Sequence, residues 1–410
     1  MSKAETGHTM PHHTDDHIGA RIADYRKLRQ LTQTGLARRA FVARGTIAKV
    51  EAGLTPATPA IVAAVARALE VEIAVLNGQP YVSEMRQDQL DRMIAPLSDA
   101  LDLYDLGPDA EVVPRPLNEI TADVETLCAG ACATEYRGVG ARLPGLLGEL
   151  TTALSLVPSE QERRTAAQAL SWAYWVTYEF TYRLGYHQLA MIALERMGWM
   201  AERAQDPLLL AIRLSKRSAM LLRHGNNRMA SRILERGHSL IGQYDAPGSV
   251  PAMAVAGTLH LAGAIAAAQA KDKGSVAGEL ELAHRAADRI GRDVPRVYWA
   301  SFGLTNVAHF DVATSVELGD LGEAMKAARN LRFPADHPRM RVGRYHIEMA
   351  RAHSLMGKAE AAEKSLQRAR EVAPQQARYH PLMRETIAVL VRRQRRASGG
   401  LASLAGWVGM

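Results

Sequence analysis

The sequence predicts an all-α protein in which a small N-terminal helical bundle precedes a long array of paired helices. Alanine is abundant, runs of β-branched residues are rare and aromatic residues make up only 5% of the chain, a composition that favours helix over strand. Hydrophobic residues (47%) and charged residues (23%) occur at the levels of an ordinary globular protein. A chain of 410 residues exceeds one ordinary hydrophobic core, so two or more domains are expected.

The first predicted domain covers residues 17–80, because short amphipathic helical segments with brief breaks run from Ile18 to Asn77. This domain contains nine Lys and Arg against four Asp and Glu, an excess of five positive charges. Over the whole chain the net charge is +7, and only nine of the 50 basic residues are Lys. Arg suits phosphate and guanine edges better than Lys does, so the local excess indicates nucleic acid as a partner. Residues 1–16 are expected to be a disordered tail.

Residues 31–53 predict two helices joined by a short turn. Thr32 is a good N-cap for the first helix, residues 41–43 break the pattern, and Gly53 ends the second helix. The residues expected to face the core are apolar at helical spacing: Leu36, Ala37, Ala40, Ile47 and Val50. Two helices joined by a turn of three to four residues make a helix-turn-helix.

The outward side chains of this unit are the candidate DNA contacts. Arg44, Thr46 and Lys49 lie in the first turns of the second helix, where a recognition helix meets base edges in the major groove. Gln33 begins the preceding helix, where its amide and the helix N-terminus suit a phosphate. Arg38 and Arg39 suit phosphates by their charge. The expected partner is double-stranded DNA.

This segment resembles the lambda-repressor-like helix-turn-helix family, also called the xenobiotic-response-element type, over residues 17–80. The flanking segments agree in order and spacing, with helices expected at 18–30, 59–69 and 73–76. The resemblance implies a five-helix bundle and a transcriptional regulator that binds specific DNA sequences. Two residues depart from the family: Phe41 stands where Gly is frequent in the turn, and Ala43 stands where a capping Ser or Thr is usual.

Residues 81–116 are predicted to be a helical linker. A helix is expected from Leu90 to Leu106, and the Gly107-Pro108 pair ends it. The sequence Val-Pro-Arg-Pro at residues 113–116 then forbids regular helix.

Residues 117–396 predict helical repeats, followed by a C-terminal tail at 397–410. A Gly that ends one helix is followed five residues later by an Ala in the next: Gly185/Ala190, Gly225/Ala230, Gly319/Ala324 and Gly357/Ala362, with a blurred copy near Gly274. The steps between these glycines are 40, 49, 45 and 38 residues. Gly permits a tight turn between antiparallel helices, and a small Ala lets their backbones approach.

The last of these copies, running through Leu366 and Ala369 to Pro374, resembles the second half of a tetratricopeptide repeat. The resemblance covers residues 165–395, although another kind of α-solenoid also fits the pattern. It implies that the first helix of each pair lines a concave face. Candidate effector-binding residues on those helices are Arg213, Arg217, Asn306, His309 and Arg344, with Lys216 and Arg341 beside them.

Seven of the chain's 22 aromatic residues gather between Trp172 and Tyr186. Trp175, Tyr178 and Tyr182 share one helical stripe and are further candidates for effector binding. The alternative is that this cluster is a core joint where the repeat domain begins.

A repressor-type head joined to a tetratricopeptide-like body also resembles the peptide-pheromone-responsive regulators of Gram-positive bacteria. The resemblance implies a homodimer whose body binds a peptide, a small molecule or a partner protein and thereby alters DNA binding. The alternative function is a protein-interaction scaffold with a vestigial helix-turn-helix.

Other classes of function lack their motifs. The chain has no Walker loop, no Gly-rich dinucleotide turn and no His-Glu-x-x-His, so neither an enzyme nor a cofactor is expected. The histidines of residues 1–16 lack metal-site spacing, and Cys128 and Cys132 are expected to stay reduced. The most apolar stretch, 252–270, is expected to be a packed helix rather than a membrane span, and the protein is expected to be cytoplasmic.

Overall fold

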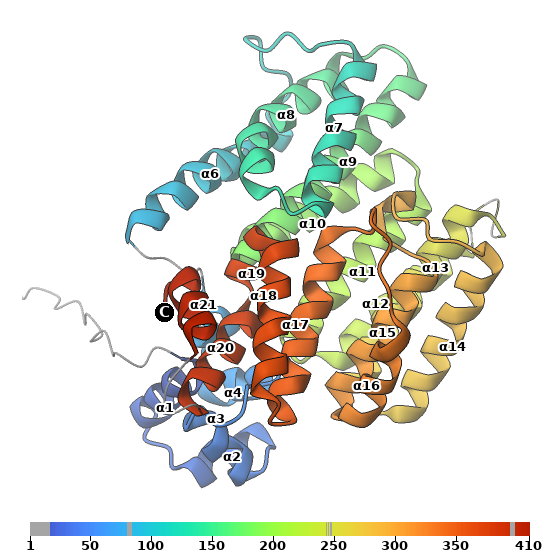
Figure 1. The fold of residues 1–410 in the computed structure, drawn as a ribbon. Coiled ribbons are helices and arrows are strands. Elements are labelled where there is room, and N and C mark those ends of the chain that lie inside the picture. Colours follow the sequence, from blue (N-terminus) through green and yellow to red (C-terminus); the bar gives the residue numbers. More distant parts are fainter. Residues whose placement is uncertain (1–16, 80–83, 243, 245, 247, 394–397) are drawn as a thin grey trace, which may run out of the picture.

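A computed structural model describes residues 17–79, 84–242, 244, 246, 248–393 and 398–410. Throughout these residues the secondary structure is helical, with one isolated β-bridge between Val294 and Phe302 and no strand. The all-α prediction is therefore confirmed. Figure 1 shows the small N-terminal bundle at one end of the molecule, against the last helices of the chain. We call residues 17–79 the head and the residues from 84 onward the body.

The head consists of five short helices around one core. Their bounds are α1 (Ile18–Leu28), α2 (Gln33–Ala40), α3 (Arg44–Glu51), α4 (Pro59–Leu69) and α5 (Ile73–Asn77). Leu36, Ile47 and Val50 are buried in this core, as the apolar spacing predicted. Thr32 caps α2, because its hydroxyl oxygen accepts a hydrogen bond from the backbone N–H of Gly35 at 3.0 Å.

The turn between α2 and α3 accommodates both unusual residues. Phe41 adopts a left-handed conformation (φ 54°) that Gly would adopt without strain, and its side chain is 96% exposed. Ala43 occupies the N-cap position of α3 and provides no side-chain acceptor for the first turn. The turn therefore has the helix-turn-helix geometry without the usual residues.

We predict that Ala43→Ser stabilises α3 by about 1 kcal/mol, because a hydroxyl at the N-cap accepts an unsatisfied N–H of the first turn. Hydrogen exchange of the α3 amides measures this local stability in the full-length chain. Ala43→Val is the control, since it adds volume without an acceptor. Equal protection in the two variants would contradict the capping argument.

Five antiparallel helix pairs form most of the body. They are α9 (Glu160–Leu184) with α10 (His187–Arg203), α11 (Pro207–Arg223) with α12 (Asn227–Ile241), α13 (Val250–Gln269) with α14 (Lys273–Ile290), α15 (Leu304–Leu318) with α16 (Leu321–Asn330), and α17 (Arg339–Leu355) with α18 (Ala359–Val372). Each glycine of the four clear copies lies in a turn with φ between 67° and 96°, and the alanine five residues later is fully buried. The predicted spacing thus locates four of the five turns between paired helices.

The blurred fifth copy has a different turn residue. Gly274 lies inside α14, and Lys271 adopts the left-handed conformation (φ 62°) in its place. Val276, five residues after Lys271, is buried where the other pairs have alanine. The repeat is therefore preserved in structure where its sequence pattern is lost.

The region predicted as a linker belongs to the body. Helix α6 (Glu84–Asp102) is longer than expected and packs against α8 (Tyr136–Leu156), while α7 (Leu117–Cys132) packs against α8 and α9. Leu97 and Leu101 of α6 are buried in the same core as α7 to α10. Only the irregular residues around 106–116 remain linker-like.

The predicted C-terminal tail is also part of the fold. Helices α19 (Pro374–Tyr379) and α20 (Pro381–Arg393) are followed by α21 (Gly399–Val408). Leu401, Leu404 and Val408 are buried against α18 and α20, and the Ser398 hydroxyl caps α21. These three apolar residues lie on one face of the helix, and that face is buried. The segment is therefore a packed helix and not a tail.

Helix α13 is long and apolar enough to span a membrane by length and composition. It packs against four helices, α11, α12, α14 and α15. Its Gly257 allows Phe302 to lie directly against the helix backbone. These contacts are those of a packed core helix.

Candidate nucleic-acid interface and head–body cavity

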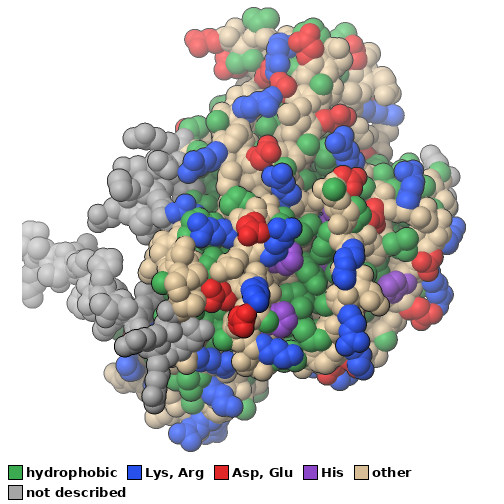
Figure 2. Space-filling view, viewed as in Figure 1, with side chains coloured by type: hydrophobic (Ala, Val, Ile, Leu, Met, Phe, Trp, Pro, Cys, Tyr) green, Lys and Arg blue, Asp and Glu red, His purple; other side chains and the backbone are tan. Residues whose placement is uncertain are grey.

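The outer surface of the helix-turn-helix is basic. The side chains of Arg38, Arg39, Arg44 and Lys49 are exposed, and none makes an ion pair or hydrogen bond with another described residue. Thr46 is half-buried one turn from Lys49, while Ile47 and Val50 face the core. Basic side chains lie over the head at the lower end of the view in Figure 2. A polyanion can therefore bind these charges without displacing a partner within the described part of the protein.

Gln33, the sixth predicted residue, belongs to a network inside the head. Glu51 at the end of α3 accepts two hydrogen bonds from Arg26 of α1, at 2.6 and 2.9 Å, and one from the amide of Gln33 at 2.9 Å. Arg26 also donates to the carbonyl of Leu31, and its bond with Glu51 raises its pKa. The network ties α1, α2 and α3 together and fixes the orientation of α3. Sequence reasoning missed it because Arg26 and Glu51 are 25 residues apart.

Residues 17–77 match the helix-turn-helix domain family. The head is a helix-turn-helix domain. This family supports DNA as the partner and regulation as the role of the head. Neither curated proteins nor solved structures yield a match to the chain. The body therefore has to be interpreted from its own geometry.

The head docks on the turn ends of the first two helix pairs. Arg67 of α4 donates to the carbonyl of Gly225 at 3.1 Å, and Ala63 packs on the same glycine. Gln79 packs on Gly185 and accepts a hydrogen bond from Arg223 at the end of α11. A Cβ at Gly185 would lie 2.9 Å from the Cβ of Gln79, so the contact requires glycine at that turn.

Helix α20 holds the other side of the head. The backbone N–H of Ala57 donates to Glu385 at 3.4 Å, and Arg393 donates to the carbonyl of Leu54. Arg392 bonds with the ring of His17, which caps α1. Head and body are thus joined by polar contacts at both edges of their interface.

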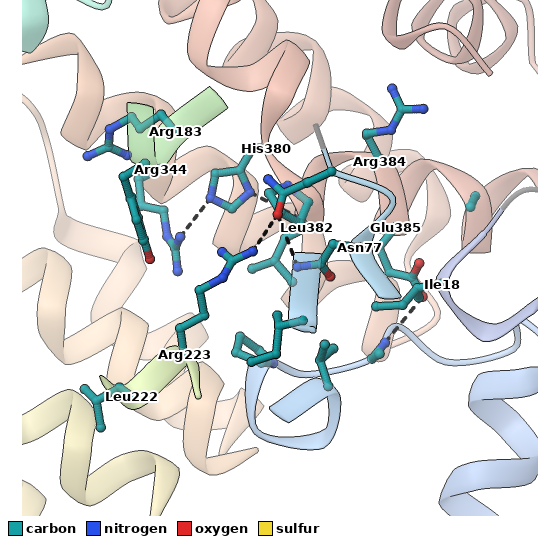
Figure 3. A pocket seen from close by; sticks show the side chains of 18 of the residues that line it. Ile18, Asn77, Arg183, Leu222, Arg223, Arg344, His380, Leu382, Arg384 and Glu385 are labelled. Atoms are coloured by element: carbon teal, nitrogen blue, oxygen red, sulfur yellow. Dashed lines mark hydrogen bonds between the residues drawn. The ribbon is translucent and has the colours of Figure 1, made fainter. Parts of the chain in front are cut away.

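Between these edges lies a cavity of about 290 Å³. Helices α1, α4 and α5 of the head form one wall, and α9, α11, α13, α17, α19 and α20 of the body form the other. The first helices of four pairs, α9, α11, α13 and α17, reach this cavity. Figure 3 shows Arg223 and Arg344 pointing toward His380 from two body helices, and Glu385 at the opposite side beside Ile18.

Two of the eight predicted effector-binding residues line this cavity, Tyr182 and Arg344. The structure places the other six elsewhere. Four are buried in the core: Trp175, Tyr178, Asn306 and His309. Their helices turn these faces toward neighbouring helices, and His309 bonds with Glu348 at 3.0 Å.

The remaining two lie on α11. Arg213 bonds with the carbonyl of Leu194 and with Glu195, and Arg217 lies 4.0 Å from that carboxylate. The cavity instead meets the last turn of α11, at Leu222 and Arg223. Arg213 and Arg217 lie nearer the N-terminus of α11 and do not line the cavity.

The two cysteines are buried and free. Burial raises the pKa of Cys132 to about 12 and that of Cys128 well above its ordinary value. Both thiols therefore stay protonated at neutral pH, and a thiolate is the form that reacts with oxidants and metals.

Glu385 makes the docked arrangement sensitive to pH. Burial raises its pKa to about 7, against the opposing effects of the Ala57 N–H, of Arg21, of the Ile18 N–H and of Arg392. An acid whose pKa is raised in the folded state stabilises that state at low pH. Its contribution is complete below the ordinary pKa and is lost as the pH rises through 7.

We therefore predict that Glu385→Gln leaves the stability at pH 5 nearly unchanged and raises it at pH 8 by about 2–3 kcal/mol. Thermal unfolding of the full-length chain between pH 5 and 8 measures the difference. Glu281→Gln, at an exposed position of α14, is the control. A variant that follows the pH profile of the wild type would refute this role for Glu385.

Proposed function

We propose that this protein is a sequence-specific transcriptional regulator whose body binds an effector and thereby changes the DNA affinity of the head. The observation that carries the proposal is a basic, unpaired helix-turn-helix surface on a head that docks across a cavity. A 60-residue reader needs no body of this size to contact an operator. The resemblance to xenobiotic-response-element regulators with tetratricopeptide-like bodies supports the same function.

We further propose that the protein acts as a homodimer in the cytoplasm. One small head covers little DNA, and symmetric pairing of two heads is the common solution. A DNA target supports the cytoplasmic location, as in the bacterial regulators that the chain resembles. A protein-interaction scaffold with a vestigial head is the competing function.

The DNA-reading part is tested by substitutions in the recognition surface. Arg44→Ala should weaken binding to the preferred DNA sequence by about 1–3 kcal/mol and reduce the difference in affinity between sequences, because Arg44 begins the recognition helix. Arg38→Ala should weaken binding to all DNA sequences alike. It should also lower the slope of log affinity against log salt concentration by about 1, as expected for one lost phosphate contact. Fluorescence anisotropy at several salt concentrations separates the two effects.

Lys27→Ala is the matched control, because it removes an exposed head charge from outside residues 32–53. If the wild type shows no salt-sensitive duplex binding, the scaffold function replaces the regulator. If all three variants bind like the wild type, the assignment of the reading surface is wrong.

The dimer is tested by the geometry of the operator. Two heads related by a two-fold axis should occupy half-sites about 34 Å apart, one turn of DNA. Footprinting measures this spacing, and light scattering measures the mass of the free and DNA-bound protein. A monomer in both states would exclude the dimer.

A further inference from the structure

We infer that the cavity between head and body binds a small organic anion with an apolar portion, and that this ligand fixes the head on the body. The inference rests on the proposed function, which it makes specific by naming the site and the chemistry of the effector. Neither wall of the cavity is complete without the other.

The charge lining the cavity is positive. Five arginines line it, and the one acidic side chain in the lining is Glu385, at the opposite side from Arg223 and Arg344. Two of the five are ion-paired behind the lining, Arg183 with Glu179 and Arg344 with Glu348. The guanidinium of Arg223 has no carboxylate partner among the described residues. It donates to Gln79 and lies 5.8 Å from the ring of Tyr182, and its Nε is buried without a partner. A partly buried guanidinium with spare donors is a ready partner for a carboxylate or phosphate.

Two further polar groups lack suitable partners in the cavity wall. Gln376 is only 2% exposed, yet neither its amide nitrogen nor its oxygen has a hydrogen bond with any residue that the structure describes. His380 is half-buried, and the loss of solvent around its ring lowers its pKa well below the ordinary value, so the ring carries one proton.

Both ring nitrogens of His380 nevertheless face N–H donors, Arg344 at 2.8 Å and the backbone of Leu382 at 3.2 Å. The neutral ring has one acceptor nitrogen, so one of these donors is left without an acceptor. An acceptor group of a ligand would satisfy these donors, and buried unpaired polar groups are costly.

The remaining lining is largely apolar. Ile18 and Val62 of the head face Leu222, Ile265 and Leu382 of the body. A volume of about 290 Å³ is at the lower end of small-molecule pockets and too small for a folded partner. The ligand therefore combines one anionic group with a short apolar body.

Because the ligand would contact both walls, it binds the docked arrangement better than any arrangement in which the head has moved away. A ligand shifts an equilibrium only by such a difference in affinity. DNA that favours a different placement of the head would lower the affinity of the protein for the ligand. By linkage, the ligand would lower the affinity for DNA by the same factor.

The test uses the full-length chain without DNA and four probes of equal chain length: octanoate, octyl phosphate, octan-1-ol and octylammonium. Calorimetric titration and thermal unfolding should show that the two anions bind and stabilise the protein while the alcohol and the amine do not. Arg223→Gln should lower the affinity for the anions about tenfold or more, because it removes a charged hydrogen bond. Arg217→Gln, two turns away on the same helix and outside the cavity, should leave it unchanged.

Gln376→Met gives a second readout that a purely structural role would not produce. It removes an unsatisfied amide at similar volume, so the unliganded protein should be at least as stable while the affinity for the anions falls. Anions that bind no better than octanol, or that bind Arg223→Gln and Arg217→Gln equally, would overturn the inference.

The same probes distinguish the inference from the proposed function. If octanoate binds through Arg223 but leaves operator affinity unchanged, the anion site is supported and its coupling to DNA is overturned. If the anions do not bind while the duplex binding remains salt-sensitive, the DNA reader is supported and the anion site is overturned.

Discussion

The close approach of backbones at the helix turns determines how this molecule is assembled. In four of the helix pairs, glycine makes the turn and a buried alanine five residues later lets the two helices pack closely. At Gly185 and Gly225 the same missing Cβ also makes room for the head, through Gln79 and through Ala63 and Arg67. The turns that order the repeats thus also create the platform for the helix-turn-helix. Larger side chains there would disturb both levels of structure.

Within the head, apolar burial and charge pairing have different roles. Apolar residues fill the core, and the ion pair between Arg26 and Glu51 fixes how the helices sit, with side chains only 13% and 6% exposed. Partly buried pairs of this kind add little net stability, but each partner becomes costly to leave alone. The Arg26–Glu51 pair therefore acts mainly on orientation. The recognition helix is held from inside while its basic residues remain available outside.

The sequence was most informative where structure is local. Caps, apolar spacing and the Gly-to-Ala interval located the head helices and four turns, because each depends on residues only a few positions apart. It was least informative about the cavity, since Arg223, Gln376 and Glu385 come from different helices and meet only through tertiary packing. Helix α21 was missed although Ser398 and the spacing of its leucines carried the signal. The turn between α13 and α14 could not be located from the sequence, because Lys271 makes it in a left-handed conformation and lysine gives no sequence signal for that conformation.

The contact between α20 and the head joins parts of the chain that are made at different times. Ala57 and Glu385 are 328 residues apart, so the head emerges from the ribosome and completes its own core long before α20 exists. Until α20 has been made, the basic surface belongs to a head that lacks its contacts with this helix. A product shortened before α20, by proteolysis or premature termination, would keep the head and lose the part of the cavity wall that α20 forms. Under the proposed function, such a fragment would occupy DNA without responding to the effector.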